Sequence, residues 1–228
     1  MNANDPNVVM VEIVAAALAQ IREPLVYLGG CATGLLITDQ GRPPVRATKD
    51  VDLIAEVVSH AAYYKLHEEL KGAGFVEDPD VTCRWRLGNQ KVDVMPTDEG
   101  ILGHTNRWYP QAIRSAAEIE LPSGRKIQVV TPPLFIATKL EAFYGRGKDD
   151  YSSHDIEDIV VLVDGRPELV DEIRHGDPEV SKYAREEFED LLANPEFLER
   201  LPWHFGTDNS SQDRVPIVIS RLREIAGL

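Results

Sequence analysis

Cysteine is scarce in this 228-residue chain, which contains only Cys31 and Cys83. So few thiols argue against a disulfide scaffold and favour a reducing compartment. No apolar run approaches the roughly 20 residues that a membrane-spanning helix requires, and residues 1–10 lack the basic and then apolar pattern of a secretory signal. We therefore expect a cytoplasmic protein with no membrane partner.

Basic residues are also in short supply, with 24 Lys and Arg against 38 Asp and Glu and a net charge of −14. A chain this acidic is not expected to bind nucleic acid non-specifically over its surface. The excess is uneven, because residues 1–147 have a net charge of −3 and residues 148–228 a net charge of −11. The composition shifts near Gly145–Asp150, where we expect a boundary or a flexible joint.

A hydrophobic share of 43% is enough for a folded core. Apolar periodicity, glycine and proline predict an α/β front half followed by an almost entirely helical back half. The predicted strands are 25–28, 50–57, 75–76, 81–87, 91–95, 119–121 and 126–130. The predicted helices are 8–21, 31–38, 61–72, 109–117, 134–144, 153–163, 167–174, 180–193 and 215–225. Residues 39–47 and 208–211 are predicted to be loops.

Gly29 and Gly30 stand between a predicted strand and a predicted helix. Glycines at such a turn let the backbone approach a ligand closely, and free N–H groups at a helix start attract phosphate. The pair also fits an ordinary tight turn that binds nothing.

Asp50 and Asp52 are two residues apart on a predicted strand, so both carboxylates project from one face. Asp93 lies on a later strand with apolar neighbours on its other face. Adjacent like charges are unfavourable unless a cation compensates them, and hard oxygen ligands suit Mg²⁺. The alternative is that these acids are simply solvated at a strand edge.

In this order, the strand, the Gly-Gly turn, the helix and the strand-borne aspartates resemble the nucleotidyltransferase superfamily of DNA polymerase β type. The resemblance implies an α+β fold, with a mixed β-sheet and flanking helices followed by a mostly helical C-terminal region. It divides the chain into a nucleotidyltransferase core at 1–130 and a helical region at 131–228. The chain departs from the family at Cys31, where many members have a serine.

The same resemblance implies a binding site for an NTP such as ATP and for two Mg²⁺ ions. The implied phosphate contacts are Gly29, Gly30 and Thr33, and the implied metal ligands and catalytic residues are Asp50, Asp52 and Asp93. In the family, the ions orient the triphosphate and activate the attacking hydroxyl.

Residues 135–148 and 154–158 resemble the AbiEii-type, toxin-like nucleotidyltransferases more specifically. The matching residues are Lys139, Arg146, Asp155 and Asp158. The resemblance implies that Lys139 is a catalytic and nucleotide-binding cation, that Asp158 belongs to the nucleotide site, and that a cognate antitoxin exists as a partner. From the residues alone, Lys139 also fits a surface lysine, and Asp155 also fits a helix N-terminal charge capped by Ser152 or Ser153. Asp158, deeper in the helix, is expected to pair with Lys139 or Arg146.

Several arginines lie where they could serve either an anion or the solvent. Arg84 and Arg86 alternate on one strand, so both project from one face and could reach a phosphate or a base. Arg42, Arg46 and Lys49 precede the aspartate pair in the predicted loop, and could guide an anionic substrate or only improve solubility.

The leading hypothesis is Mg²⁺-dependent transfer of a nucleoside monophosphate from an NTP to an acceptor hydroxyl. By resemblance the acceptor is RNA, particularly tRNA, in a toxin–antitoxin setting. A protein hydroxyl stays open as the acceptor. The first alternative is a small-molecule, antibiotic-modifying nucleotidyltransferase, for which the acidic back half would suit a cationic drug. The second is a non-catalytic, antitoxin-like protein that only binds nucleotide.

Overall fold

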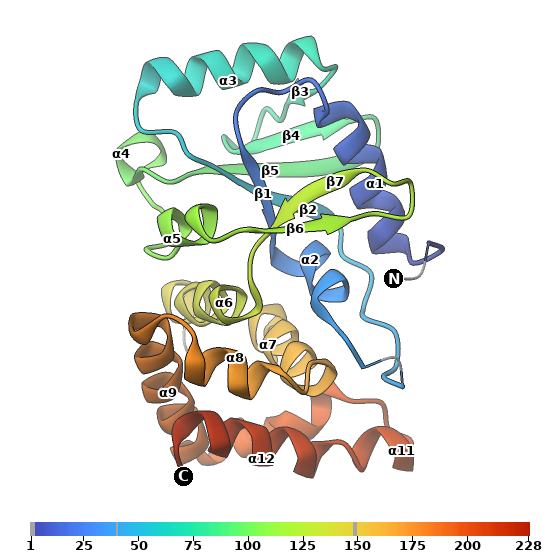
Figure 1. The fold of residues 1–228 in the computed structure, drawn as a ribbon, viewed down its shortest axis with the longest axis vertical. Coiled ribbons are helices and arrows are strands. Elements are labelled where there is room, and N and C mark those ends of the chain that lie inside the picture. Colours follow the sequence, from blue (N-terminus) through green and yellow to red (C-terminus); the bar gives the residue numbers. More distant parts are fainter. Residues whose placement is uncertain (1–2, 40, 148–149) are drawn as a thin grey trace. The chain divides into compact units, whose positions relative to one another are not determined.

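The structure, a computed structural model, describes residues 3–39, 41–147 and 150–228. The chain divides into two compact units, whose elements Figure 1 colours along the sequence. The first unit comprises Met1–Leu35 and Arg46–Thr131, and the second comprises Leu36–Val45 and Pro132–Leu228. The predicted joint at 145–150 lies partly outside the described residues. The predicted division after residue 130 remains a proposal, and it places 36–45 with the core rather than with the helices.

The first unit is built on a mixed seven-stranded sheet with the order β3-β4-β5-β2-β1-β7-β6. Strand β1 is antiparallel to β2 and parallel to β7, β2 is parallel to β5, and the remaining pairs are antiparallel. The strands are β1 (Leu25–Leu28), β2 (Asp50–Ala55), β3 (Val76–Glu77), β4 (Arg84–Leu87), β5 (Gln90–Pro96), β6 (Ala117–Glu120) and β7 (Lys126–Val129).

Helices flank this sheet, as Figure 1 shows. They are α1 (Pro6–Leu18), α2 (Gly29–Leu36), α3 (His60–Gly72), α4 (Glu99–Leu102) and α5 (Tyr109–Arg114). Asp5 caps α1, with a proline at the first helical position, and Ser59 caps α3, as expected for these residue types. Helix α2 starts two residues earlier than predicted, directly at the Gly-Gly turn, and α4 was not predicted.

Strand β2 runs from a half-exposed end into the core. Val51, Leu53 and the last two residues of the strand are buried, whereas Asp50 and Asp52 are partly exposed. The two faces therefore differ only at the start of the strand, where the aspartates lie. Burial of the apolar residues fixes the register, because a slip by one residue would turn both carboxylates into the core.

The second unit is helical. Its elements are α6 (Pro132–Gly147), α7 (His154–Gly165), α8 (Leu169–His175), α9 (Pro178–Ala193), α10 (Pro195–Arg200), the 3₁₀ helix η1 (Leu201–His204), α11 (Asn209–Gln212) and α12 (Val215–Ala226). The prediction of a loop at 208–211 was wrong, because Asp208 accepts a hydrogen bond from the Ser211 amide and caps α11.

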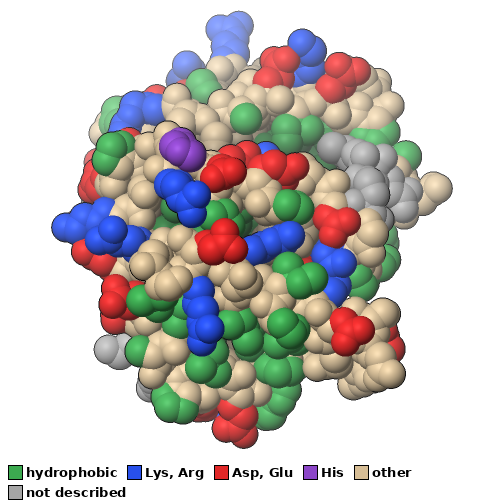
Figure 2. All heavy atoms as spheres, turned by 60° about the horizontal axis from the view of Figure 1, so that its bottom comes forward, with side chains coloured by type: hydrophobic (Ala, Val, Ile, Leu, Met, Phe, Trp, Pro, Cys, Tyr) green, Lys and Arg blue, Asp and Glu red, His purple; other side chains and the backbone are tan. Residues whose placement is uncertain are grey.

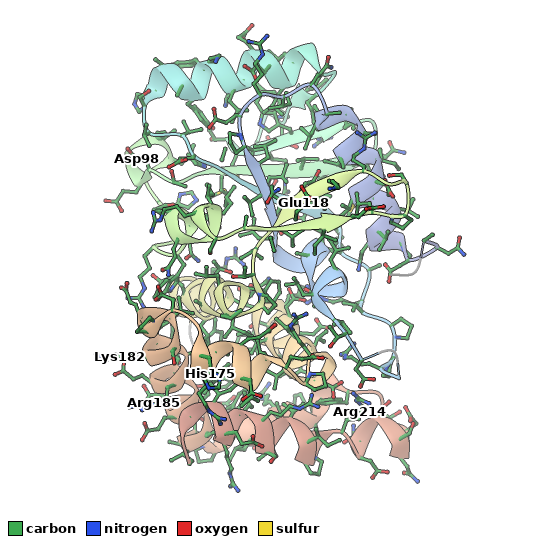
Figure 3. All side chains as sticks on the ribbon, viewed as in Figure 1. Asp98, Glu118, His175, Lys182, Arg185 and Arg214 are labelled. Atoms are coloured by element: carbon green, nitrogen blue, oxygen red, sulfur yellow. The ribbon has the colours of Figure 1, made fainter. Side chains whose placement is uncertain are left out.

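A buried ion network ties the segment 36–45 to the helices of the second unit. The side chain of Asp164 is 1% exposed. Its carboxylate accepts a hydrogen bond from Arg42 Nε at 2.9 Å and another from Arg214 Nε at 2.7 Å. Arg214, labelled in Figure 3, also donates to Asp39 at 2.6 Å. Arg42 therefore has a packing role within this unit, which neither interpretation of its sequence position had included.

Charged side chains of both signs lie interspersed on the face of the molecule in Figure 2. Among the described residues, no helix combines the length and the apolar character that crossing a membrane would need.

Candidate active site

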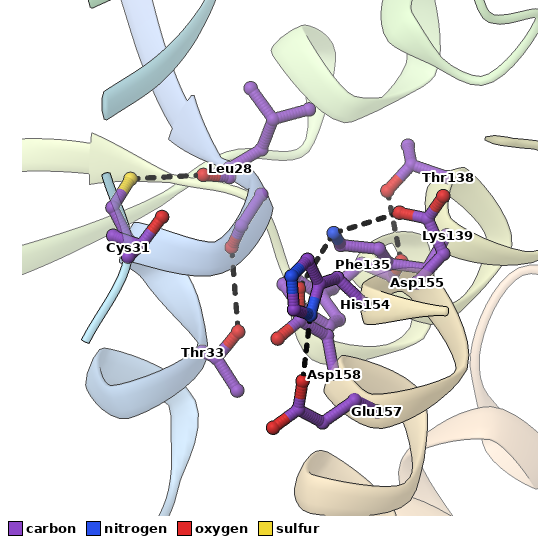
Figure 4. Close-up of polar contacts among 12 residues, drawn as sticks. Leu28, Cys31, Thr33, Phe135, Thr138, Lys139, His154, Asp155, Glu157 and Asp158 are labelled. Atoms are coloured by element: carbon purple, nitrogen blue, oxygen red, sulfur yellow. Dashed lines mark hydrogen bonds and ion pairs between the residues drawn. The ribbon is translucent and has the colours of Figure 1, made fainter. Parts of the chain in front are cut away.

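At the turn from β1 into α2, the backbone of Gly29 lies against the carboxylate of Asp52. Gly29 has φ +68°, and a Cβ added there would overlap Asp52 Oδ2. Glycine is required on both counts, because side-chain-bearing residues rarely adopt this φ and the carboxylate already fills the space. In Figure 4, the Cys31 thiol donates to Leu28 O at 3.1 Å, and the buried Thr33 hydroxyl donates to Gly29 O at 3.5 Å. Both side chains thus brace the turn from within α2.

Replacing Gly29 with alanine is expected to destabilise the protein by about 1–3 kcal/mol more than replacing Gly74 does, because overpacking adds to the strain of a positive φ. Gly74 is the matched control: its φ is +89°, and an added Cβ there meets nothing within 4 Å. Urea unfolding of both variants measures the difference. Equal losses of stability would show that Asp52 moves aside without cost.

Asp50, Asp52 and Asp93 lie on one face of the sheet. In the parallel pairing of β2 with β5, Asp52 is the register partner of Asp93, and Asp50 is two residues away on the same face. All three side chains are partly exposed, while Val51 and Val92 on the other face are fully buried. The structure therefore brings together the three carboxylates and the Gly29 turn.

The loop that leads into β2 is held in place by a residue that sequence reasoning missed. Asn7 of α1 is 2% exposed, and its amide donates to Arg46 O at 2.9 Å and accepts from Thr48 N at 2.8 Å. The Thr48 hydroxyl in turn donates to Asp50 Oδ1 at 3.2 Å. A Cβ added at Gly30 would lie 3.4 Å from Arg46 Nη2, so Arg46 borders the glycine turn. This position is the one that Arg46 would need in order to guide an anionic substrate. A buried polar residue in an apolar helix was the available signal for Asn7.

Arg84 of β4 pairs directly with two of the three carboxylates. Its Nε donates to Asp93 Oδ1 at 2.7 Å, and its Nη2 donates to Asp93 Oδ2 at 2.7 Å and to Asp50 Oδ2 at 3.3 Å. The hydrogen bonds to Asp93 hold the pKa of the Arg84 guanidinium above its ordinary value. Burial, with the charge of Asp93, raises the pKa of the neighbouring Cys83 thiol, so Cys83 is expected to stay protonated near neutral pH.

The carboxylate set has the ligand chemistry of a divalent-cation site but not its preformed geometry. No three His, Cys, Asp or Glu side chains in the described part of the chain form a ready-made metal site. The chemistry fits, because carboxylate oxygens are the ligands that Mg²⁺ prefers. Arg84 Nη2 contacts both Asp50 and Asp93, so these two carboxylates already share one positively charged group. The arrangement is a carboxylate set paired with arginine.

Lys139 and the Asp-x-x-Asp pair meet within the helical unit. Lys139 Nζ lies 3.1 Å from Asp155 Oδ1 and 2.7 Å from Asp158 Oδ2 (Figure 4). Arg146 Nη1 lies 3.0 Å from Asp155 Oδ2. The side chain of Asp158 is 1% exposed and that of Lys139 is 12% exposed. The expected pairing of Asp158 is thus with Lys139. Ser153 caps α7, so Asp155 also occupies the favourable N-terminal position.

No protein-family model and no curated protein matches the sequence. An antigenic nucleotidyltransferase-like protein from Paracoccidioides brasiliensis is similar in structure, with a TM-score of 0.54 and 20% identity over 87% of this chain and 93% of that chain. A nucleotidyltransferase candidate from H. pylori gives a TM-score of 0.50 and 13% identity over 100% and 96%. The chain has the nucleotidyltransferase fold. The predicted mixed sheet with flanking helices and a helical C-terminal region is confirmed.

Within a nucleotidyltransferase fold, the first unit holds six of the predicted site residues, which are Gly29, Gly30, Thr33, Asp50, Asp52 and Asp93. Lys139 and Asp158 belong to the second unit. Their predicted role at the nucleotide stays a prediction. Arg84 was noted in the sequence only as a possible phosphate or base contact, and its pairing with the aspartates is new.

Proposed function

We propose that the protein transfers a nucleoside monophosphate from an NTP to an acceptor hydroxyl and releases pyrophosphate. The observation that carries the proposal is the convergence of Asp50, Asp52 and Asp93 beside the Gly29 turn in a nucleotidyltransferase fold. Three like charges on one partly exposed face repel one another, and the single positive charge of Arg84 offsets only part of that repulsion. A metal-dependent reaction accounts for the remaining carboxylate charge, because divalent cations bind such oxygen ligands.

The roles of the residues follow from their chemistry. Asp50 and Asp52, with Asp93, would hold two Mg²⁺ ions, which when bound neutralise the triphosphate and make the acceptor hydroxyl easier to deprotonate. Asp93 would also take up the hydroxyl proton. The acceptor oxygen bonds to the α-phosphorus, the bond from that phosphorus to the β-bridging oxygen breaks, and its electron pair leaves with pyrophosphate.

Phosphate binding is assigned to the start of α2. The N–H groups of Gly29 and Gly30 would hold phosphate oxygens, as N–H groups at a helix start do. Thr33 would contribute by bracing Gly29, since its buried hydroxyl reaches a phosphate only by giving up that hydrogen bond. The proposed roles of Lys139 and Asp158 in nucleotide binding rest on the sequence resemblance, and Lys139 would serve there only with part of its charge balanced by two carboxylates.

Two classes of acceptor are proposed, and each has its own support. RNA, particularly tRNA, with a toxin role and a cognate antitoxin, rests on the resemblance to AbiEii-type proteins. A cationic small molecule is supported by the net charge of −11 carried by residues 148–228, which disfavours RNA and suits a cationic acceptor. Magnesium dependence and ATP as donor belong to the same proposal.

The experiment is an incubation of the purified protein with each α-³²P-labelled NTP, Mg²⁺ and one acceptor class at a time: total RNA, a protein lysate or an aminoglycoside set. We expect label on one acceptor class and pyrophosphate release in the same amount, both lost when EDTA is added. Label on RNA supports the toxin-like role, and label on an aminoglycoside supports the small-molecule role. Nucleotide binding by calorimetry without transfer to any class would instead support the non-catalytic alternative.

A further inference from the structure

One guanidinium bridges two members of the carboxylate set. Arg84 spans Asp93 with two parallel hydrogen bonds of 2.7 Å and reaches Asp50 at 3.3 Å. Parallel bonds between a guanidinium and a carboxylate are the strongest form of this pair, and they use both oxygens of Asp93. The side chains of Arg84 and Asp93 are 22% and 15% exposed, so water screens the pair only in part.

The neighbouring arginine shows that this pairing is specific. Arg86 lies two residues along β4 and therefore on the same face. It pairs instead with Asp78, with Nη2 at 2.7 Å from Oδ2. The strand thus presents two arginines of the same orientation, of which only Arg84 contacts the proposed metal ligands.

A divalent cation and Arg84 would bind the same carboxylate oxygens of Asp93. An ion bound by Asp93 needs at least one oxygen that Arg84 now uses, and it would lie close to a positive group. Both cannot hold Asp93 at full strength. The guanidinium, once released, would face the side of the sheet where an anionic ligand is proposed to bind.

On the basis of the metal-dependent function proposed above, we propose that Arg84 is an internal competitor of the divalent cation. It offsets one of the two negative charges of Asp50 and Asp93 in the metal-free protein and gives up Asp93 when the cation binds. The affinity of the site for the cation is therefore set by how easily Arg84 leaves. Arg84 acts here as a positioning residue, through the carboxylates.

The test is Mn²⁺ binding to the full chain without nucleotide, followed by electron paramagnetic resonance of the free ion. Arg84→Gln is expected to lower the Kd for Mn²⁺ at least tenfold, because glutamine keeps a polar chain but removes the charge. Arg86→Gln is the matched control, with an expected Kd within twofold of wild type. Arg84→Lys, which cannot bridge both oxygens of Asp93, should fall between the two and serves if the glutamine variant does not fold.

Thermal unfolding gives a second readout that needs no turnover. Without metal, Arg84→Gln should unfold at a lower temperature than wild type, and added Mn²⁺ should raise its Tm by more than it raises that of wild type. Wild-type Mn²⁺ binding with no tightening in the Arg84 variants would overturn the competitor role and leave the proposed function standing. No Mn²⁺ binding by wild type or by either Arg84 variant would overturn both.

Discussion

Asp52→Asn is expected to reduce nucleotidyl transfer by about 10³-fold or more while leaving the fold in place. Asp52 sits between the Gly29 turn and its register partner Asp93, so it is central to the proposed metal site. Asparagine keeps the shape and removes the charge. Losing a metal-ion contribution of several kcal/mol to the transition state corresponds to a rate loss of this size. Label transfer under single-turnover conditions measures it.

The same substitution should leave the protein folded under the assay conditions, which separates a catalytic role from a structural one. Asparagine has nearly the shape of aspartate and its side-chain oxygen still accepts a hydrogen bond, so the change removes the charge without opening a cavity. The control is Asp78→Asn, a carboxylate of the same unit that pairs with Arg86 outside the set. It should affect urea unfolding but leave transfer within about threefold, well under one tenfold step. Full transfer by Asp52→Asn would refute the proposed site.

Asp164→Ala is expected to destabilise the helical unit by about 3–5 kcal/mol, the usual effect of removing one partner from a buried ion pair. The carboxylate of Asp164 is 1% exposed and serves both Arg42 and Arg214. Its removal leaves Arg42, whose side chain is 7% exposed, without its carboxylate partner. Urea unfolding followed by circular dichroism at 222 nm reports the loss, because the helices dominate that signal.

Asp171→Ala is the matched control for that result. Asp171 and its partner Arg174 have side chains that are 73% and 54% exposed, so their pair should contribute within about 0.5 kcal/mol of zero. Asp164→Asn should fall between the two, since the amide can still accept one hydrogen bond. If Asp164→Ala and Asp171→Ala unfolded alike, water would be replacing the lost carboxylate.

The elements that carry the candidate site could be predicted because their signals are local. Two signals depend only on residues within a few positions of one another. One is the apolar strand that stops directly before Gly29, and the other is the alternation of Asp50 and Asp52 with buried neighbours. The parallel pairing of β2 with β5, which places Asp93 beside Asp52, forms only when the sheet assembles. The sequence could therefore suggest Asp93 only through the order of the motifs.

The partners of Arg84 and Arg42 could not be predicted, because the register of the β4–β5 hairpin decides the first and a long-range contact decides the second. Arg84 and Arg86 are equivalent by alternation, and only the antiparallel pairing that puts Arg84 opposite Asp93 distinguishes them. Arg42 meets Asp164 across 122 residues of chain. The helix after Asp208 is a different kind of miss, since an aspartate cap was visible in the sequence but polar composition was given more weight.

The segment Leu36–Val45 has a consequence for how the gene can be divided. It belongs to the helical unit, yet residues of the sheet unit precede and follow it, so the chain passes between the units at three places. A fragment beginning at Pro132 would lack Arg42, and one ending at Thr131 would carry Arg42 away from Asp164. Neither unit is encoded by one continuous stretch of the gene. Exchange of whole units between related genes would have to move two separate pieces together, so these halves are more apt to evolve as a single inherited block.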